Sequence, residues 1–361
     1  MHKPDYILLI SIITISLFGV LMIYSSSYVW ALYKFNNPLK FALTQWIFLL
    51  IGYLIIYILL SIPYTYYLKH ANSIFIICLI LLVLVLIPGI GSVRNGSRSW
   101  FGVGGFGIQP SEFSKLGLII FTSKYLANSE KQLNNISGIL PILVILMIIF
   151  GLIMLQPDFG TGVIIVITII GLLFISGVNM SFFIKLGLLG LVGVVGLIVV
   201  APYRIKRIVS FLNPWTDPLG SGFQIIQSLY AIGPSGLLGS GFGNSIQKHF
   251  YLPEPQTDFI FSIISEEFGF VGVLIVSILF FVIIYRGFRI SKNCENKFGK
   301  YLSFGITFGL AFQAILNLMV VVGLIPVTGV TLPFLSYGGS SLLITMLSMG
   351  ILLNISKYNY D

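Results

Sequence analysis

Long apolar stretches alternate with short polar ones along the whole chain. A helix needs about 20 apolar residues to cross a hydrocarbon core of about 30 Å, and ten stretches approach that length. They cover residues 6–27, 42–62, 71–89, 110–127, 138–156, 160–178, 184–201, 258–285, 301–324 and 339–356. We therefore predict an all-α polytopic membrane protein whose ten transmembrane helices form a single domain over residues 1–361.

The connections between these stretches refine the prediction. Only QPDFGT, residues 156–161, separates the fifth stretch from the sixth, so these two are expected to form a tight helical hairpin. The fourth stretch opens with a polar first turn, QPSEFSK. The first stretch is too long for the core of a signal peptide and has no convincing cleavage site, so we expect it to be retained as a membrane span.

Composition supports the same class. Of the 361 residues, 57% are hydrophobic and 9% are charged, and no water-soluble fold could cover its surface with that balance. The net charge of +9 does not indicate nucleic-acid binding, because no Lys/Arg cluster lies beside a polar soluble domain. Cys78 and Cys294 lie far apart in the sequence, so we expect neither a disulfide nor a cysteine metal site.

Lysine and arginine are unevenly distributed over the predicted short loops, and in membrane proteins they concentrate on the cytoplasmic side. With the N-terminus inside, the inner side holds Lys3, Lys69, Lys124, Lys131, Lys185, Arg286, Arg289, Lys292, Lys297, Lys300 and Lys357. The short outer loops hold only Lys34, Lys40, Arg94 and Arg98. This asymmetry predicts that both termini are cytoplasmic and that the long segment 202–257 before the eighth helix is extracytoplasmic.

The outer segment 202–257 carries two patterns. Within 223–233 the apolar positions at helical spacing are Phe223, Ile226, Leu229 and Tyr230, and the polar positions that face elsewhere are Gln224, Gln227 and Ser228. This pattern predicts a short amphipathic helix at the membrane interface. The glycine-rich string GLLGSGFG, residues 236–243, permits tight turns or a close approach to a ligand. The segment is expected to cap the bundle, and it can bind a ligand as well.

The acidic residues indicate a candidate catalytic group. Four of the 11 acidic residues lie in HFYLPEPQTDFIFSIISEEFGFVG, residues 249–272, namely Glu254, Asp258, Glu266 and Glu267. Asp258 stands where the eighth span begins, and ionisable groups in membrane helices are costly and seldom without function. Its spacing from Ser262, Ser265 and Glu266 would place all four on one helical face. We interpret Asp258 as a general base; alternatively, it only complements the helix dipole.

A second outer motif is NGSRSWFGVGGFGIQPSEFSK. In it Ser111 is a candidate N-cap, with Glu112 in the first helical turn. Lys115 is spaced to pair with Glu112. Trp100 is either an interfacial anchor or, with Arg98, a group that grips a sugar or a phosphorylated head group.

Two more outer positions read as helix starts. Asp158 follows a proline and can cap the helix that begins at Phe159. In VTGVTLPFLSYGGSSLL, residues 327–343, the Gly-Gly-Ser-Ser run can present backbone N–H groups to an anion or simply begin the last helix.

These strings, in this order, resemble the SEDS family (shape, elongation, division and sporulation) of bacterial peptidoglycan polymerases. The resemblance covers nearly the whole chain and rests on NGSRSWF, QPSEFSK, QPDFGT, YRIKRIVSFLNPW, GFQIIQSLYAIG, LPEPQTDFIFSIISEEFGFVG and LPFLSYGGSS. NGSRSW, PYRIKR and SIQKHFYLPEP make the chain more similar to the division branch, FtsW, than to the elongation branch, RodA. The chain departs from the family at Gln256, where a His is frequent, and at Pro234-Ser235, where Ser-Gly is usual. Its short N-terminus is less typical of FtsW, which keeps an elongation role open.

The resemblance implies a ten-span protein of the bacterial inner membrane, located at the division septum. It implies polymerisation of lipid II into glycan strands on the outer face, with an essential aspartate matching Asp258. It also implies a class B penicillin-binding protein and other divisome proteins as partners. Because an α-linked donor becomes a β-linked product, undecaprenyl pyrophosphate must leave in one inverting displacement without a covalent sugar–enzyme intermediate.

The expected chemistry gives each candidate residue a role. Asp258 is the catalytic base. The leaving pyrophosphate needs positive charge, and the candidates for it are Arg98, Lys115, Arg204, Arg207 and Lys248, with Trp100 as a further substrate contact. A divalent cation, Mg²⁺ or Mn²⁺, is another candidate, although no ligand cluster in the sequence indicates one. Structural or supporting roles are expected for Glu112, Asp158, Glu254 and Glu266.

Two other functions fit a basic polytopic chain. A lipid II flippase would place charges and helix breaks near the membrane midplane, whereas the charges in these motifs cluster at the outer boundary. A divisome scaffold would recruit other proteins, and that role can coexist with catalysis.

Overall fold

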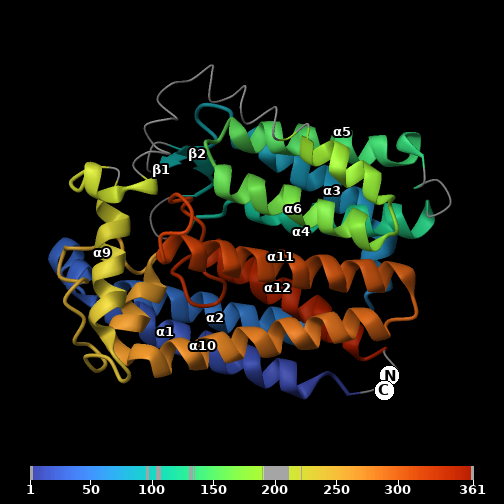
Figure 1. Ribbon diagram of the computed structural model, residues 1–361. Coiled ribbons are helices and arrows are strands. Elements are labelled where there is room, and N and C mark those ends of the chain that lie inside the picture. Colours follow the sequence, from blue (N-terminus) through green and yellow to red (C-terminus); the bar gives the residue numbers. More distant parts are fainter. Residues whose placement is uncertain are drawn as a thin grey trace.

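Helices that run side by side make up most of the computed structural model (Figure 1). It describes residues 3–358 apart from 95–96, 103–106, 130–132, 134, 189, 191–210 and 221. The long helices are α1 (Tyr6–Phe35), α2 (Lys40–Leu59), α3 (Thr65–Leu84), α4 (Pro110–Asn128), α5 (Ile136–Met154), α6 (Phe159–Ile175), α10 (Ile260–Asn293), α11 (Lys297–Val321) and α12 (Gly339–Ser356). They match nine of the ten predicted spans, and the seventh, 184–201, lies largely outside the described residues.

The polytopic helical class is confirmed. Within the described residues, the helices that are long and apolar enough to cross a membrane are α1, α2, α3, α5, α10, α11 and α12. Helix α6 is apolar but has only 17 residues. Helix α4 opens with the polar first turn that its sequence indicated.

Several helix boundaries differ from the prediction. Helix α1 ends at Phe35 instead of residue 27, and α10 ends at Asn293 instead of residue 285. Hydropathy detects only the apolar part of a helix, so a helix that continues past the hydrocarbon core is predicted too short. Helix α3 begins at Thr65 instead of residue 71, because its polar first turn was assigned to a loop. Helices α5 and α6 form the expected hairpin and pack against each other.

A two-stranded antiparallel hairpin, β1 (Ser92–Arg94) and β2 (Ser97–Trp100), corrects the purely helical prediction. The missed signal is the Asn95-Gly96 pair, a sequence typical of tight hairpin turns. The hydroxyl of Ser97 donates to the backbone carbonyl of Gln156. This hydrogen bond attaches the hairpin to the connection between α5 and α6.

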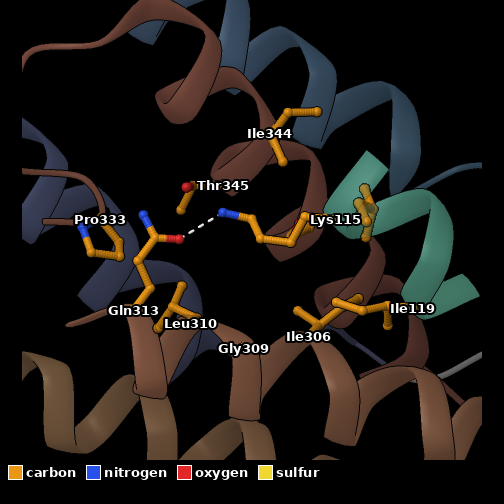
Figure 2. A pocket seen from close by; sticks show the side chains of 11 residues that line it. Lys115, Ile119, Ile306, Gly309, Leu310, Gln313, Pro333, Ile344 and Thr345 are labelled. Atoms are coloured by element: carbon orange, nitrogen blue, oxygen red, sulfur yellow. Dashed lines mark hydrogen bonds between the residues drawn. The ribbon is translucent and has the colours of Figure 1, made fainter. Parts of the chain in front are cut away.

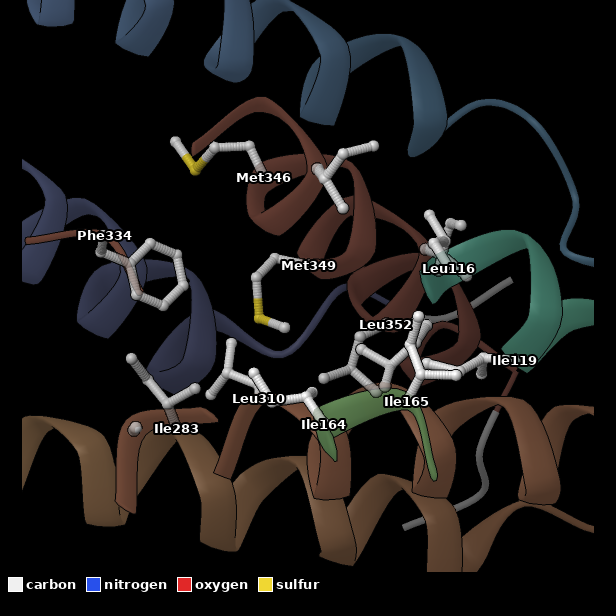
Figure 3. Close-up of a cluster of buried hydrophobic side chains, with 14 of the residues drawn as sticks. Leu116, Ile119, Ile164, Ile165, Ile283, Leu310, Phe334, Met346, Met349 and Leu352 are labelled. Atoms are coloured by element: carbon white, nitrogen blue, oxygen red, sulfur yellow. The ribbon is translucent and has the colours of Figure 1, made fainter. Parts of the chain in front are cut away.

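Helix α11 lies at the centre of the bundle. It packs against α4, α6, α10 and α12, and most of its side chains are buried. Figure 3 shows the apolar cluster that these helices share, to which α4 contributes Leu116, α6 Ile164 and α11 Leu310, with Met346 and Met349 from α12. The core therefore holds these helices in fixed relative positions.

The described part of the segment 202–257 contains two 3-10 turns, Pro214–Thr216 and Gly233–Ser235, and the predicted short helix, α9 (Phe223–Ile232). The faces of α9 were partly predicted wrongly, because Ser228 is buried and Tyr230 is 50% exposed. The Ser228 hydroxyl can be buried because it donates to the carbonyl of Val321 at 2.6 Å and lies 2.7 Å from the hydroxyl of Ser262.

The two ends of the described chain meet at one end of the bundle, opposite β1, β2 and α9 (Figure 1). There the backbone N–H of Asp5 donates to the hydroxyl of Ser356 at 3.0 Å. The motifs singled out in the sequence therefore gather at the other end.

Candidate active site

A cavity of about 670 Å³ lies at the end of the bundle that carries β2 and α9. Five stretches line it: the hairpin at 97–100, the start of α4, the start of α6, the segment 253–258 with Gln224, and residues 328–341. Small-molecule sites typically enclose about 300–1,000 Å³, so this cavity can hold a substrate. The carboxylates that line it are those of Glu112, Asp158, Glu254 and Asp258.

Asp258 lies just before α10, because that helix begins at Ile260 and its N-cap residue is Phe259. The carboxylate of Asp258 accepts a hydrogen bond from the hydroxyl of Thr257 at 2.9 Å. The interpretation of Asp258 as a residue on one face of α10 is therefore corrected. Ser262 and Ser265 do lie on the helix, and their hydroxyls face those of Ser228 and Ser235.

Backbone contacts fix the position of Asp258. The side-chain amide of Asn317, on α11, donates to the carbonyl of Asp258 and to that of Val330, both at 2.7 Å. Two residues before Asp258, the carbonyl of Gln256 accepts a hydrogen bond from the N–H of Tyr337 at 2.8 Å. The central helix thus holds the aspartate against the wall formed by residues 328–341.

Burial raises the pKa of the Asp258 carboxyl above its ordinary value. The hydroxyl of Thr257 lowers that pKa, and the nearby charge of Glu254 raises it further. A carboxylate with a raised pKa is a stronger base than an exposed aspartate, which is what proton abstraction from a sugar hydroxyl requires.

Helix α10 is interrupted at Gly269, which has a φ of 62°. The glycine-rich string meets the interruption: the N–H groups of Ser240 and Gly241 donate to the carbonyls of Glu266 and Glu267, both at 2.9 Å. The N–H groups of Phe270 and Val271 donate in turn to the carbonyls of Gly236 and Leu237. A Cβ on Gly269 would lie 2.4 Å from the backbone nitrogen of Gly239, so neither glycine can be replaced without moving the string.

Glu266 organises the polypeptide that leads to Asp258. Its carboxylate accepts hydrogen bonds from the Ser245 hydroxyl at 2.5 Å and from the Ile246 N–H at 2.7 Å. These two hydrogen bonds agree with the expected supporting role of Glu266 among buried polar groups.

Lys248 and Glu267 form a fully buried ion pair, with 2.8 Å between Nζ and Oε1 and no exposure of either side chain. The hydroxyl of Ser25, on α1, lies 2.6 Å from Oε1 of Glu267 and 3.3 Å from Nζ of Lys248. Lys248 does not line the large cavity. The structure therefore gives this lysine a role in holding α1, the outer segment and α10 together, instead of the pyrophosphate contact expected from the sequence.

Asp158, which also lines the cavity, caps α6 as predicted, since its carboxylate accepts from the N–H of Thr161 at 3.2 Å. It also accepts hydrogen bonds from the side chains of Gln109 at 2.9 Å and Ser111 at 3.1 Å. Burial raises the pKa of this carboxyl, and hydrogen bonds from Thr161 lower it. The prediction that Ser111 caps α4 is wrong, because the N-cap residue is Gln109 and the Ser111 hydroxyl is directed to Asp158.

Lys115 pairs with Glu112 at 3.0 Å, as predicted. Its ammonium also donates to the amide oxygen of Gln313 at 2.6 Å. Figure 2 shows it pointing toward Gln313 in a separate cavity of about 30 Å³, which has room for little more than a water molecule. Glu112 reaches the large cavity and Lys115 does not.

Comparison with known proteins identifies the family. The model of the "cell cycle protein" family named for FtsW, RodA and SpoVE matches residues 6–361. The chain belongs to the FtsW/RodA/SpoVE family. Stage V sporulation protein E of Bacillus subtilis is 52% identical over 99% of this chain and 98% of its own length. The protein named "Probable peptidoglycan glycosyltransferase FtsW" of Trichlorobacter lovleyi is 43% identical over 98% of this chain and 93% of its own.

Solved structures of the FtsW/RodA/SpoVE fold superpose over the full chain. A chain of a peptidoglycan synthase complex, described as showing structural coordination of polymerization and crosslinking, has a TM-score of 0.83 and 29% identity, covering 99% of both chains. The rod shape determining protein RodA of Thermus thermophilus has a TM-score of 0.73 and 26% identity, covering 99% of this chain and 98% of its own. The resemblance to SEDS proteins inferred from the motifs is thereby confirmed.

The structure places the remaining predicted substrate contacts of this FtsW/RodA/SpoVE chain at different distances from the large cavity, or does not describe them. Trp100 lines the large cavity. Arg98 is partly buried and its side chain lies close to Gly91, away from the cavity lining. Arg204 and Arg207 lie outside the described residues. Among the described side chains, no group of three His, Cys, Asp or Glu residues is placed to hold a metal ion, so the four cavity carboxylates do not form a site with three such ligands.

Sequence reasoning missed Gln313 and Asn317, which connect α11 to the cavity walls. They stand four residues apart in an apolar span, so they project from the same face of a helix. Polar side chains inside a membrane span generally have a partner or a function. That signal could have marked α11 as the helix that holds the site.

Proposed function

We propose that this chain is a peptidoglycan glycosyltransferase that polymerises lipid II into glycan strands on the outer face of the bacterial cytoplasmic membrane during cell division. The observation that carries the proposal is the Asp258 carboxylate, with a raised pKa, in a cavity of about 670 Å³. Relatives named as peptidoglycan glycosyltransferases FtsW support the reaction. Their names and the identity to a sporulation protein favour a division-type role over an elongation role.

Asp258 is proposed as the general base. The 4-hydroxyl of the acceptor sugar attacks the anomeric carbon of the donor, and the carboxylate takes the hydroxyl proton. The new bond from the acceptor oxygen to the anomeric carbon forms as the bond from that carbon to the pyrophosphate oxygen breaks. Undecaprenyl pyrophosphate leaves with the electron pair, and the configuration inverts in a single displacement. A positioned base contributes typically about 10²–10⁴-fold to such a step.

The leaving pyrophosphate requires positive charge. Lys115 and Lys248 are each engaged in an ion pair and do not line the cavity, so we propose Arg204 and Arg207 for this role, with Trp100 stacking on a sugar ring. No step of the proposed mechanism passes through Mg²⁺ or Mn²⁺. A chelator series in the polymerisation assay would report any requirement for a divalent cation.

We also propose a class B penicillin-binding protein and other divisome membrane proteins as partners, at the division septum. The peptidoglycan synthase complex among the similar structures supports a partner of this kind.

Both termini are proposed to be cytoplasmic. The basic loops predicted on the inner side support this orientation, as does the position of both chain ends opposite the cavity.

The interruption of α10 favours a second candidate, a lipid II flippase, because transporters use broken membrane helices at their binding sites. In a transporter the free backbone groups of the break face the substrate. Here the groups at Glu266, Glu267, Phe270 and Val271 are hydrogen-bonded to the string 236–241. The break is filled by the protein itself, and we therefore retain the polymerase as the main proposal.

Polymerisation of labelled lipid II at varying pH tests the role of Asp258. Since its pKa is raised, the rate is expected to fall on acidification at a pH above the ordinary aspartate pKa. Replacing Glu254 with Gln removes a charge that raises the pKa of Asp258, so this acid limb should move to lower pH. Glu295→Gln, an exposed change at the far end of the bundle, is the matched control. If the rate of the Glu254→Gln variant fell at the same acidic pH as that of the wild type, the result would argue against Asp258 as the titrating base.

A further inference from the structure

A second large cavity, of about 480 Å³, lies at the end of the bundle where the chain termini meet. Its lining comes from residues 3–7 at the start of α1, from the last turns of α10, and from Ser356 at the end of α12. No part of the proposed catalytic apparatus reaches it. Of the helices that bound it, α10 packs against both α1 and α12, and the N–H of Asp5 bonds to the hydroxyl of Ser356, so the cavity is a built feature of the fold.

The described residues give this cavity a net positive charge. Lys3, Arg286 and Arg289 line it together with a single acid, Asp5. One oxygen of Asp5 caps α1 by accepting from the N–H of Leu8 at 3.0 Å. The other accepts from Arg286, with contacts of 2.7 Å to Nε and 2.6 Å to a terminal nitrogen. Both carboxylate oxygens of Asp5 therefore accept hydrogen bonds, and the carboxylate holds the side chain of Arg286 in place.

Lys3 and Arg289 are exposed and form no ion pair with any described residue. Two unpaired cations beside a rigid third one favour an anionic ligand with several oxygen acceptors. Arginine in particular binds phosphate oxygens through two parallel N–H bonds. A phosphoryl group matches this arrangement better than a single carboxylate does.

Exposed apolar side chains continue from the cavity along the outside of α1 and α10. Tyr6 and Ile7 line the cavity and are more than half exposed. Farther along the same two helices, Ile10, Phe281 and Tyr285 are also more than half exposed. Such a surface on a membrane helix faces acyl chains. A ligand at this place therefore has an anionic head in the cavity and an apolar tail against the helices.

We propose that this cavity binds the phosphate headgroup of an anionic phospholipid, whose acyl chains lie along α1 and α10. Basic pockets between membrane helices are suited to such headgroups. A bound lipid would link the beginning of α1, the end of α10 and the end of α12 at the membrane surface. The site is independent of the proposed polymerase activity.

Native mass spectrometry of the purified full-length chain tests the proposal, with phosphatidylglycerol or phosphatidylcholine titrated into neutral detergent micelles. The wild type should bind phosphatidylglycerol in preference to phosphatidylcholine. Lys3→Gln combined with Arg289→Gln should weaken phosphatidylglycerol binding about five- to twenty-five-fold, since each basic residue at an anionic surface contributes a factor of about five. Both side chains are exposed, so the variant should fold.

The matched control is Lys69→Gln combined with Lys292→Gln, which removes the same charge from exposed positions outside the cavity lining. Its affinity for phosphatidylglycerol should stay within twofold of the wild type. An equal loss in the control would reduce the effect to general surface charge and overturn the proposal. Inorganic phosphate that displaced phosphatidylglycerol at millimolar concentration would overturn it too, by assigning the cavity to a soluble phosphate.

Discussion

Replacing Asp258 with asparagine is expected to abolish glycan polymerisation by the purified chain and its proposed penicillin-binding partner. Asparagine keeps the size of the side chain and can still accept the hydrogen bond from Thr257, but it cannot take a proton. The rate should fall about 10²–10⁴-fold, the usual contribution of a positioned general base. The measurement is the yield of polymer from labelled lipid II, resolved by length.

Two controls separate chemistry from folding. The bond from Asn317 reaches the backbone of residue 258, so the variant should retain wild-type thermal stability and partner binding. Asp258→Ala is equally informative, because the side chain of Asp258 does not cap α10 and its removal should not weaken the helix start. If the asparagine protein polymerised at the wild-type rate, Asp258 would be structural and Glu254, on the same cavity, would become the candidate base.

The second large effect is expected from Glu267→Gln. This change removes the negative charge beside the buried ammonium of Lys248 and leaves it neutral acceptors, the amide oxygen of the new glutamine and the hydroxyl of Ser25 at 3.3 Å. Breaking a buried ion pair by removing one partner costs about 3–5 kcal/mol. The unfolding temperature in detergent should drop markedly, and polymer yield should drop with it because the segment carrying Asp258 loses an anchor.

The double variant Lys248→Met with Glu267→Gln tests whether the cost comes from the unpaired charge. Removing both charges should recover part of the lost stability, since a buried pair replaced by uncharged groups is often tolerated. Glu295→Gln, at an exposed position, should leave the unfolding temperature unchanged. A single variant as stable as the wild type would show that the pair does not hold the outer segment in place.

The bundle was predictable because its signal is local. A run of apolar residues of the right length has few alternatives to a membrane helix, and the described helices agree with those runs. The presence of Asp258 at the large cavity was predictable for a related reason, since a carboxylate at the start of an apolar span stands out from its surroundings; its role as the base stays a prediction. The Asp158 cap and the pairing of Glu112 with Lys115 are short-range contacts, which sequence spacing captures.

Long-range pairing could not be predicted in the same way. Lys248 looked like a free cation in a polar segment, and only the interruption at Gly269 and the approach of α1 reveal its pairing with Glu267. Ser111 had the residue type of a cap, but its hydroxyl donates instead to Asp158, a half-buried aspartate at the start of another helix. In both cases the deciding partner lies far away in sequence, where neither spacing nor propensity carries information.

Labelled lipid II supplied to the wild-type chain and its proposed penicillin-binding partner in sealed vesicles tests the central claim most directly. The assay scores two products at once, glycan polymer and lipid II moved across the bilayer. We predict glycan polymer from the wild-type chain and none with Asp258→Asn. Lipid II that crosses the bilayer without being joined into strands would contradict the proposal and establish the chain as a transporter.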